Sequence, residues 1–507
     1  MQDGNENMLD RTSETVVSAP SLDDLFRRSV ARKPDADALA DPLDKARITG
    51  QQPRRLTYAQ ADRAVANLAA HFVEAGMPTG SIVALQLPNT IEATLTMLAA
   101  VRAGLVVALL PQLWRQAELT DALNRIGARA LIGFARIDGI DHAEIAMNAA
   151  AEAFSIRHVG VFGNDVPEGI AALDDIVFGP NQLRTIAERD PRRANVITFD
   201  FTPEGLRVVP RTQMQVIAGG LAIFLETTVL PGTRMLSAVM PSTFAGLCAS
   251  TVTWLLSGGS LGFHHPFDGE TLLSQVVRDR TELLIAPAPL ALRLGEAQVF
   301  TGLASLTQVI GLWRTPEQAA ASTTWTAAQR FDDLYAFGEA GLFAIPRDND
   351  GAAAPVLPGS PMRRGQGSAA AGEAFITKDG TLALRGAMVP VAAYAPPRRP
   401  GLAAQPPQAD HVDTGYAARL DRRTGVISIT APPSGVVNVG GYRFLANDLN
   451  DWAQRLPQGG MLTALPDRVS GHRLAGRASD NARARAALAQ LGLNPLMVEA
   501  FRDRNSS

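Results

Sequence analysis

The sequence has a single cysteine, Cys248, among its 507 residues. One cysteine excludes an internal disulfide framework and a zinc site built from cysteines. Its neighbours, in the run Gly-Leu-Cys-Ala-Ser, are small or apolar, which favours a buried core thiol over a nucleophile. We therefore expect a protein of the cytoplasm, where thiols stay reduced.

A basic excess and a long apolar run are also missing. Lysine and arginine total 47 against 50 aspartate and glutamate, for a net charge of -3, whereas proteins that bind nucleic acid carry clustered positive charge. The apolar stretch Leu95–Leu110 is interrupted by Arg102 and Gly104 and is shorter than the roughly 20 residues of a membrane helix. Residues 1–7 are polar, unlike a signal peptide. We expect no nucleic-acid binding, no membrane span and no export signal.

The chain does have an alternation of two hydrophobic periods. Between Leu56 and Gly133 the apolar residues switch between helical spacing and short β-rich runs such as SIVALQL and ALIG, as in βαβ units on a mostly parallel sheet. Thr57 and Gln60 stand in a capping-box arrangement before the first helix. Residues 195–345 repeat the pattern, with VITF, RMLSAVM, SLGF and LLIAPA as strands. The pattern predicts an α/β fold with two helix-flanked β-sheets.

The remaining segments predict smaller units. Residues 346–372 and 395–407 are rich in Pro, Gly and Ala, which is typical of exposed loops, and GTLALRG between them is a strand candidate. Beyond residue 420, the short strands VISIT and VVNVGG and two helices, over 445–455 and 481–491, predict a small α+β cap. We expect a large N-terminal domain over residues 1–420 and a small C-terminal domain over residues 421–507.

The run VALQLPNTIEATLTMLAAVRAGLVVALLP strongly resembles the N-terminal subdomain of acyl- and aryl-CoA synthetases of the adenylate-forming superfamily. Four later landmarks follow in the family's order. They are ITFDFTPEGLRVVPRTQMQ at its phosphate loop, LYAFGEAG at its Tyr-Gly-x-Thr-Glu motif, VDTGYAARLDRRTG at its Thr-Gly-Asp segment and VNVGGYRF at its glycine-rich C-terminal motif. Each is weak alone, but their order and spacing make the resemblance specific.

The resemblance implies a large N-terminal domain of two sheets and a small β-barrel-like subdomain, followed by a C-terminal cap. It also implies a two-step ligase that uses ATP and Mg²⁺ to activate a carboxylate as its acyl-adenylate and then transfers the acyl group to CoA. Such chemistry needs a loop of small residues whose backbone N–H groups converge on the triphosphate. The residues at the family's positions can therefore be compared with what the chemistry needs.

At the phosphate-loop position the chain has Asp200–Arg207, with two carboxylates, a phenylalanine and a proline. A carboxylate that faces a triphosphate is repelled by about 1 kcal/mol per pair even in water, and Pro203 removes one N–H donor. Only Gly205 matches the family pattern cleanly. Arg207 falls at the family's lysine if one deletion is allowed, so it either holds a phosphate or is a surface arginine.

At the adenine motif the chain keeps a tyrosine and a glutamate. The resemblance implies that Tyr335 stacks near adenine and that Glu339 binds Mg²⁺. The alternative for Tyr335 is a core aromatic at a strand end, and for Glu339 a carboxylate at a helix start. Glu339 is the one candidate for a catalytic or metal-binding role, and no residue is assigned to catalysis firmly.

Other positions of the family pattern are replaced. Tyr416 stands where the family has the aspartate that binds the ribose hydroxyls, and a phenol cannot accept both hydrogen bonds as a carboxylate does. Pro432 stands where an arginine contacts the nucleotide. The sequence ends at Asn505–Ser507 without the Ser/Thr-Gly-Lys segment whose lysine the adenylation step uses. These losses predict weak or absent adenylation.

Two further segments bear on a role for histidine. Pro241–Gly246 corresponds to the region where the family has an aromatic or histidine gate, and this segment contains no histidine. The pair His264 and His265 has no third ligand at metal spacing, which favours a structural role over metal binding.

The glycine-rich motif is the best preserved of the landmarks. The resemblance implies that Gly440 and Gly441 lie near the CoA route and that Asp421 is the hinge about which the cap rotates. The alternative for the two glycines is a tight turn that needs their backbone geometry.

We hypothesise from these residues a synthetase-like protein that has lost ATP-dependent adenylation and serves as a non-catalytic binding or regulatory protein. Its ligand would be an acyl, aryl or CoA-type molecule, held by residues within 286–292, 311–314 and 335–343, or a partner protein. The alternative is a divergent acyl-CoA ligase in which Arg207, Tyr335 and Glu339 contact the nucleotide and a partner chain supplies the lysine. A third possibility is a scaffold that pairs with an active homologue.

Overall fold

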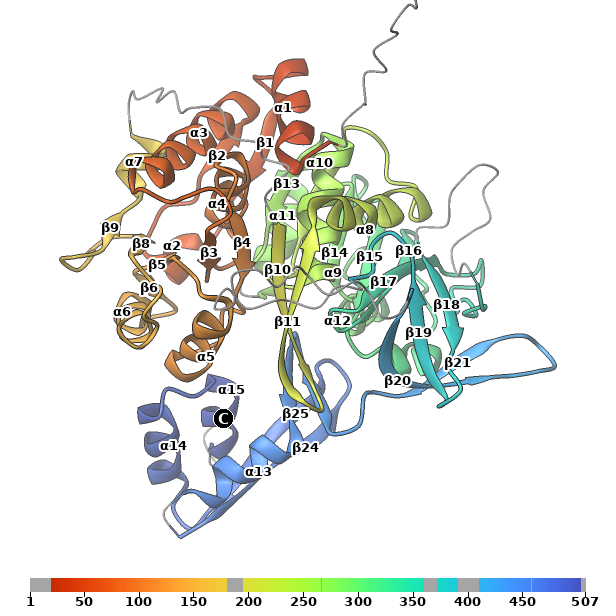
Figure 1. The fold of residues 1–507 in the computed structure, drawn as a ribbon. Helices are drawn as coiled ribbons and strands as arrows, with labels where there is room; N and C mark the ends of the chain where they lie inside the picture. Colours follow the sequence, from red (N-terminus) through yellow and green to blue (C-terminus); the bar gives the residue numbers. More distant parts are fainter. Residues whose placement is uncertain are drawn as a thin grey trace, which may run out of the picture.

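The computed structural model describes residues 20–179, 195–265, 267–359, 372–390, 410–456 and 458–502. Several of the sequence expectations lie outside these residues: the polar start at residues 1–7, the loop at 395–407, most of 360–372 and the end of the sequence at 505–507. Figure 1 shows the described elements, with two central sheets, a smaller sheet beside them and a C-terminal unit below.

The first sheet has seven strands and is mostly parallel at its centre. Its order is β11-β10-β4-β3-β5-β8-β9, and β10 and β11 form an antiparallel hairpin at one edge. The strands are β3 (Ile82–Leu85), β4 (Val106–Leu109), β5 (Ala130–Phe134), β8 (His158–Phe162), β9 (Ala171–Ala172), β10 (Asn195–Thr202) and β11 (Gly205–Thr212). Its connecting helices are α3 (Tyr58–Glu74), α4 (Ile91–Arg102), α5 (Gln116–Ile126), α6 (His142–Glu152) and α7 (Asp174–Phe178).

The second sheet has eight strands in the order β17-β16-β15-β14-β12-β13-β1-β2. The strands are β1 (Asp37–Ala40), β2 (Arg55–Thr57), β12 (Arg234–Ser237), β13 (Ser260–Phe263), β14 (Leu283–Pro287), β15 (Gln308–Trp313), β16 (Arg330–Phe337) and β17 (Gly341–Pro346). Its helices are α1 (Leu22–Arg32), α2 (Lys45–Thr49), α8 (Gln213–Glu226), α9 (Phe244–Leu247), α10 (Thr253–Ser257), α11 (Gly269–Arg278) and α12 (Ala288–Glu296). Short elements complete this part: the hairpin β6 (Arg136–Ile137) and β7 (Ile140–Asp141), a π-helical turn at Cys248–Val252 and a 3₁₀ turn at Pro316–Ala321.

The predicted α/β class and the two helix-flanked sheets are confirmed. The strand runs VITF, RMLSAVM, SLGF and LLIAPA contain or overlap β10, β12, β13 and β14. The capping box at the start of α3 also forms, because Gln60 N–H donates to Thr57 Oγ1 at 3.3 Å and Thr57 N–H donates to Gln60 Oε1 at 2.9 Å. Local pattern and capping chemistry thus specify these elements.

Two smaller antiparallel sheets follow. One has the order β18-β19-β20-β21, from β18 (Glu373–Ile376), β19 (Thr381–Arg385), β20 (Val412–Leu420) and β21 (Ile427–Ala431). The other has the order β23-β22-β25-β24, from β22 (Val436–Val439), β23 (Tyr442–Leu445), β24 (Gly460–Asp467) and β25 (Gly471–Ala478), with α13 (Ala446–Gln454), α14 (Asn481–Gln490), α15 (Pro495–Val498) and a 3₁₀ turn at Glu499–Phe501. We call this last sheet and its helices the C-terminal unit.

The change from one small sheet to the next lies later than residue 420. Strands β20 and β21 pair directly, with Leu420 opposite Ile427, so the sheet continues across the expected boundary. Asp421 lies in the turn between them, where its Oδ1 accepts hydrogen bonds from the N–H groups of Arg423 and Thr424 at 2.8 and 3.3 Å. We therefore propose that the C-terminal unit begins within residues 432–435.

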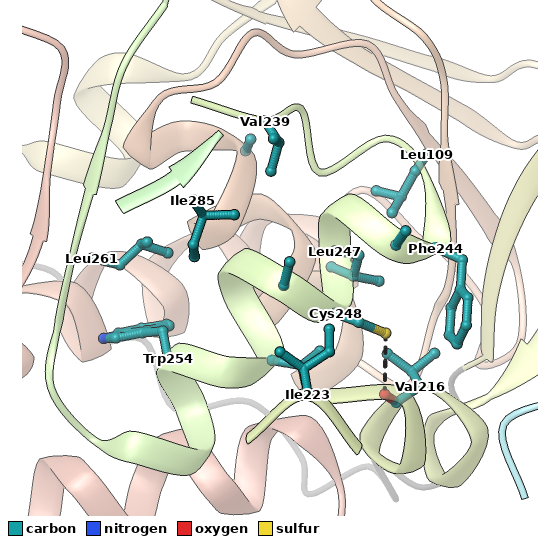
Figure 2. Packing of buried hydrophobic residues seen from close by; sticks show 14 of the residues in the cluster. Leu109, Val216, Ile223, Val239, Phe244, Leu247, Cys248, Trp254, Leu261 and Ile285 are labelled. Atoms are coloured by element: carbon teal, nitrogen blue, oxygen red, sulfur yellow. Dashed lines mark hydrogen bonds between the residues drawn. The ribbon is translucent and has the colours of Figure 1, made fainter. Parts of the chain in front are cut away.

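The apolar core runs between the two large sheets. Cys248 is completely buried in it beside α8, as Figure 2 shows, and its Sγ is 3.5 Å from the Val216 carbonyl oxygen. Phe244 and Leu247 lie close to it in the same view. The expected core thiol is confirmed, and burial raises its pKa well above the usual value, which opposes nucleophilic chemistry.

Candidate functional site

The segment expected as a phosphate loop is a β-hairpin. Strands β10 and β11 pair residue by residue up to Thr202 and Gly205, so only Pro203 and Glu204 form the turn. Gly205 has φ of 107°, a conformation that favours glycine. Most of the residues at the family's phosphate-loop position, Asp200–Arg207, therefore belong to two paired strands and not to a loop. Figure 1 shows the hairpin running toward the C-terminal unit.

Asp200 is a buried acceptor at this hairpin. Its Oδ2 accepts the Glu339 N–H at 2.9 Å, and its Oδ1 accepts Nη1 of Arg443 from the C-terminal unit at 2.7 Å. Arg207 is the direct cross-strand neighbour of Asp200 and its side chain is exposed. At the turn, a hydrogen bond from Thr202 lowers the pKa of the Glu204 carboxyl, so this exposed group carries a negative charge at neutral pH.

Glu339 lies in the turn between β16 and β17 and is 4% exposed. Its carboxylate accepts the Phe244 N–H at 2.9 Å and lies 3.8 Å from Nη1 of Arg211. Burial raises the pKa of this carboxyl to about 7, although Arg211 opposes the shift. The nearest cation to Glu339 is therefore a guanidinium of the chain itself.

Arg211 is a buried arginine on β11. Its guanidinium lies 3.8 Å from the centre of the Phe244 ring and donates to the carbonyl oxygen of Glu339. Nη1 also donates to Thr198 Oγ1 at 3.3 Å. Burial lowers the pKa of Arg211 to about 10. Burial thus opposes the charged forms of both Arg211 and Glu339, whereas their mutual attraction favours them.

Tyr335 lies in the core. It lines neither of two cavities near Glu339, which are called the inner cavity and the hairpin cavity and are described below. It sits on β16 opposite Phe343, with ring centres 5.2 Å apart, and is 3% exposed. Successive residues of a strand face opposite sides, and it is Ala336 that faces the inner cavity. The environment matches the core-aromatic alternative, while a role beside adenine stays a prediction.

Tyr416 occupies the position of the expected ribose carboxylate and is completely buried. Its ring stands edge-on to Phe337 with centres 5.4 Å apart, and its hydroxyl accepts a hydrogen bond from Nη2 of Arg443 at 2.6 Å. The preceding Gly415 has φ of 73°. The phenol is therefore engaged inside the protein.

The glycine-rich motif forms the tight turn between β22 and β23. Val439 pairs with Tyr442, so Gly440 and Gly441 are the two turn residues, and Gly440 has φ of 60°. Arg314 directly follows β15, in the part of the described chain that precedes the C-terminal unit and that we call the large unit. It donates from Nη1 to the Gly441 carbonyl oxygen at 3.2 Å and from Nη2 to Thr243 Oγ1 at 3.1 Å. The turn of the C-terminal unit thus lies against the large unit.

Two adjoining cavities meet at Glu339. The inner cavity is narrow, with a volume of about 50 Å³, and its lining includes Trp114, Phe199, Arg314, Glu339, Gly440 and Gly441. The hairpin cavity is larger, with a volume of about 360 Å³, and its lining includes Glu204, Arg207, Glu339, Asp413, Thr414 and Ser434. The structure therefore brings Arg207, Glu339, Gly440 and Gly441 to one region, whereas Tyr335 and Asp421 lie elsewhere.

Known proteins are similar to this chain in sequence and in fold. The family model described as AMP-binding enzyme matches residues 26–366. The chain belongs to the AMP-binding enzyme family. It is also similar in fold to the amide bond synthetase McbA from Marinactinospora thermotolerans, with a TM-score of 0.71, 18% sequence identity and 94% of each chain covered.

Among curated relatives, the chain is 26% identical over 275 residues to the pyochelin synthase PchD of Pseudomonas aeruginosa, covering 53% of this chain and 47% of that protein. It is 30% identical over 150 residues to a salicyl-AMP ligase / salicyl-S-ArCP synthetase of Mycobacterium tuberculosis, covering 30% of this chain and 26% of that protein. The chain thus spans about half the length of PchD and about a quarter of the length of the salicyl-AMP ligase.

The AMP-binding enzyme family implies Mg²⁺ and ATP, and the residues present do not fit them well. A triphosphate needs several converging N–H donors, but the hairpin turn offers one proline, which has no N–H, and the ionised Glu204. A metal ion at Glu339 would compete with the Phe244 N–H and lie beside the Arg211 cation. No group of three or more histidine, cysteine, aspartate or glutamate side chains suited to a metal occurs among the described residues.

Lysine is scarce in this member of the AMP-binding enzyme family. The sequence contains lysine at positions 33, 45 and 378 only. Lys45 is fully buried and binds Asp41 at 2.8 Å and also Glu92. Lys33 follows α1, 5.6 Å from the centre of the Tyr58 ring, and Lys378 is exposed in the turn between β18 and β19. The inner and hairpin cavities have no lysine among their described lining residues.

The other expectations are settled by side-chain contacts. His264 Nδ1 is 2.6 Å from Gln275 Oε1, and its Nε2 accepts the Asp268 N–H at 3.1 Å, which matches the structural role expected for His264; a structural role for His265 stays a prediction. Gly311 was expected to line a pocket. A Cβ at this position would lie 2.4 Å from the Phe331 ring, so that ring occupies the space beside the glycine. No helix among the described residues has the length and hydropathy needed to cross a bilayer.

Sequence reasoning missed the two arginines that organise the site, Arg211 and Arg443. A signal for Arg211 exists in the sequence, because it directly follows the apolar run Val208–Pro210 of a strand. A charged side chain that is buried in such a strand usually has a partner. Arg443 stands within the quoted VNVGGYRF motif, but two of its three acceptors, Tyr416 and Asp200, are 27 and 243 residues away along the chain, and no local pattern connects them with it.

Proposed function

We propose that this chain is a member of the AMP-binding enzyme family that has lost ATP-dependent adenylation and serves as a non-catalytic binding or regulatory protein. One observation carries the proposal. The groups at the family's phosphate-loop, ribose and Mg²⁺ positions are Asp200, Tyr416 and Glu339, and each is bound by an arginine or a backbone N–H of the same chain.

The electrostatics of the hairpin cavity support this proposal. Glu204 and Asp413 add negative charge to its lining, with Arg207 as the exposed cation. A nucleotide phosphate placed there would meet carboxylates at the position where the family has hydroxyls and backbone donors. Such repulsion is weakened by water but not removed, so ATP would have to bind against it.

The inner cavity supports the binding part of the proposal. Its lining combines the aromatic rings of Trp114, Phe199 and Phe201 with the backbone of Gly440 and Gly441. Aromatic walls with a few polar groups are typical of small-molecule sites. We propose an acyl, aryl or CoA-type ligand that occupies the larger hairpin cavity and reaches into this inner one.

A divergent ligase is the second candidate, and one observation favours it. Glu339 and Arg207 both line the hairpin cavity, so a carboxylate and a cation remain where the family handles the nucleotide. In this candidate the Arg443 contacts would open when ATP binds, and a second protein would supply a lysine.

Titration calorimetry with Mg-ATP, beside CoA and a Glu339→Ala variant, distinguishes the two candidates. We expect no heat from millimolar Mg-ATP and no ATP–pyrophosphate exchange with salicylate or octanoate as the carboxylate. Micromolar Mg-ATP binding that weakens in Glu339→Ala, or exchange above the rate without protein, would contradict the proposal and favour the ligase. Heat from CoA alone would support the binding function.

A further inference from the structure

Arg443 connects three separate sheets. It lies on β23 in the C-terminal unit, directly after the glycine turn and Tyr442. Its Nη1 donates to Asp200 Oδ1 on β10 at 2.7 Å, its Nη2 to Tyr416 Oη on β20 at 2.6 Å, and its Nε to Asn438 Oδ1 on β22 at 3.0 Å. A single planar guanidinium thus uses all three of its nitrogen atoms.

These contacts are shielded from water. The side chains of Arg443 and Asp200 are 12% and 11% exposed, and Tyr416 is completely buried. Burial alone would lower the pKa of Arg443, but the carboxylate of Asp200 and the phenol of Tyr416 raise it above the usual value. Hydrogen bonds to ionised groups are about twice as strong as neutral ones, and salt screens buried pairs little.

Asp200 and Tyr416 are the two replaced residues at the family's phosphate-loop and ribose positions. With an aspartate in place of Tyr416, the buried guanidinium would face two carboxylates, and without Asp200 it would have no anionic partner in this contact. The two replacements therefore match Arg443 in charge and hydrogen-bonding capacity. Loss of ATP binding alone does not explain this match, because many other side chains at the two positions would also abolish ATP binding.

Neighbouring contacts hold the same face of the C-terminal unit. Besides the Arg314 bond to Gly441, the Tyr442 hydroxyl accepts the Leu113 N–H at 3.3 Å. The Ala117 N–H, on α5, donates to the Gly492 carbonyl oxygen at 3.4 Å. These bonds are longer than those of Arg443 and involve neutral groups on at least one side, so the Arg443 cluster is the strongest polar contact described between the two units.

We propose that Arg443 is a latch that holds the C-terminal unit in one orientation against the large unit, with Asp200 and Tyr416 as its acceptors. The latch lies at the junction of the inner and hairpin cavities, both of which Arg443 lines. It keeps the glycine turn over the inner cavity, and a ligand that enters the hairpin cavity has to compete for the same groups. The inference concerns movement of the C-terminal unit and does not depend on whether ATP binds.

The test is a distance measurement between two spin labels in the full chain. Cysteines are placed by Glu270→Cys on α11 and Gln490→Cys on α14, two exposed positions, while the buried Cys248 stays unlabelled. We expect one narrow distance distribution in the parent protein and a broadened or two-component distribution in Arg443→Met. The matched control is Arg477→Met, an exposed arginine on β25 of the same unit, which should leave the distribution unchanged.

Two conservative variants keep the test decisive if Arg443→Met does not fold. Tyr416→Phe removes only the phenol oxygen, and Asp200→Asn removes only the charge. We expect both to broaden the distribution, with little additional effect when they are combined. Distributions identical to the parent protein in both variants would overturn the latch. ATP binding by the parent protein would contradict the proposed function but leave this result unaffected.

Discussion

Replacing Glu339 by glutamine is expected to change how the free energy of unfolding depends on pH. Burial raises the pKa of Glu339 from its ordinary value of 4.5 to about 7. Between these two pH values the unfolded chain releases a proton that the folded chain keeps, so raising the pH favours unfolding. The stability that the protonated carboxyl contributes is present below pH 4.5 and is lost as the pH rises through about 7. The glutamine variant has no such proton.

The size of the effect follows from the two pKa values. A rise from 4.5 to about 7 corresponds to about 3 kcal/mol. We expect the unfolding free energy of Glu339→Gln, relative to the parent protein, to increase by about this amount between pH 4.5 and 8. This change is separate from any constant offset, since glutamine can still accept the Phe244 N–H while Arg211 loses its anionic neighbour.

Urea denaturation at a series of pH values, with refolding checked at each, measures the difference. Glu296→Gln, at an exposed position at the end of α12, is the matched control and should show a constant difference across the range. A difference for Glu339→Gln that varies by less than about 0.5 kcal/mol from pH 5 to 8 would refute the reasoning. It would mean that Arg211 keeps Glu339 ionised in the folded protein despite burial.

Two further predictions concern buried groups outside the cavities. Lys45→Met should lower the unfolding free energy by about 3–5 kcal/mol, because Asp41 and Glu92 lose their shared cation in the core; urea denaturation measures this, and the exposed Lys378→Met should change it by less than about 0.5 kcal/mol. The Cys248 thiol should react with an aromatic disulfide reagent only in denaturant, since it is buried and its pKa is raised; labelling of the folded protein within minutes would show that the core opens at this position.

The amino-acid sequence was sufficient to predict the classes of element and their order. Periodicity from Leu56 onward predicted the helices and strands of the first large sheet, because an apolar stripe at helical or alternating spacing has one way to be buried. The capping box at Thr57 was predicted for a similar reason, since both of its hydrogen bonds join residues three apart. The order of the family landmarks then predicted the architecture beyond these local patterns.

The candidate site depends on contacts between residues far apart in the chain, which become visible in the folded structure. Asp200 and Glu204 were recognised in the sequence as unsuited to a phosphate, but the pairing of their segment into a hairpin was not predicted. Whether the chain forms a loop or a hairpin there depends on the pairing of β10 with β11. The buried partners of Glu339 could not be predicted either, because Phe244 lies 95 residues away along the chain.

Arg443 shows the same limit most clearly. Its bond to Asp200 joins residues 243 positions apart, and the charge of each is visible in the sequence while their meeting is not. A hydrogen bond becomes strong when folding removes water from both partners, and burial of this kind is a property of the whole fold. The sequence determined which chemical groups the site contains, and the packing of the C-terminal unit against the large unit decided which of them bind one another.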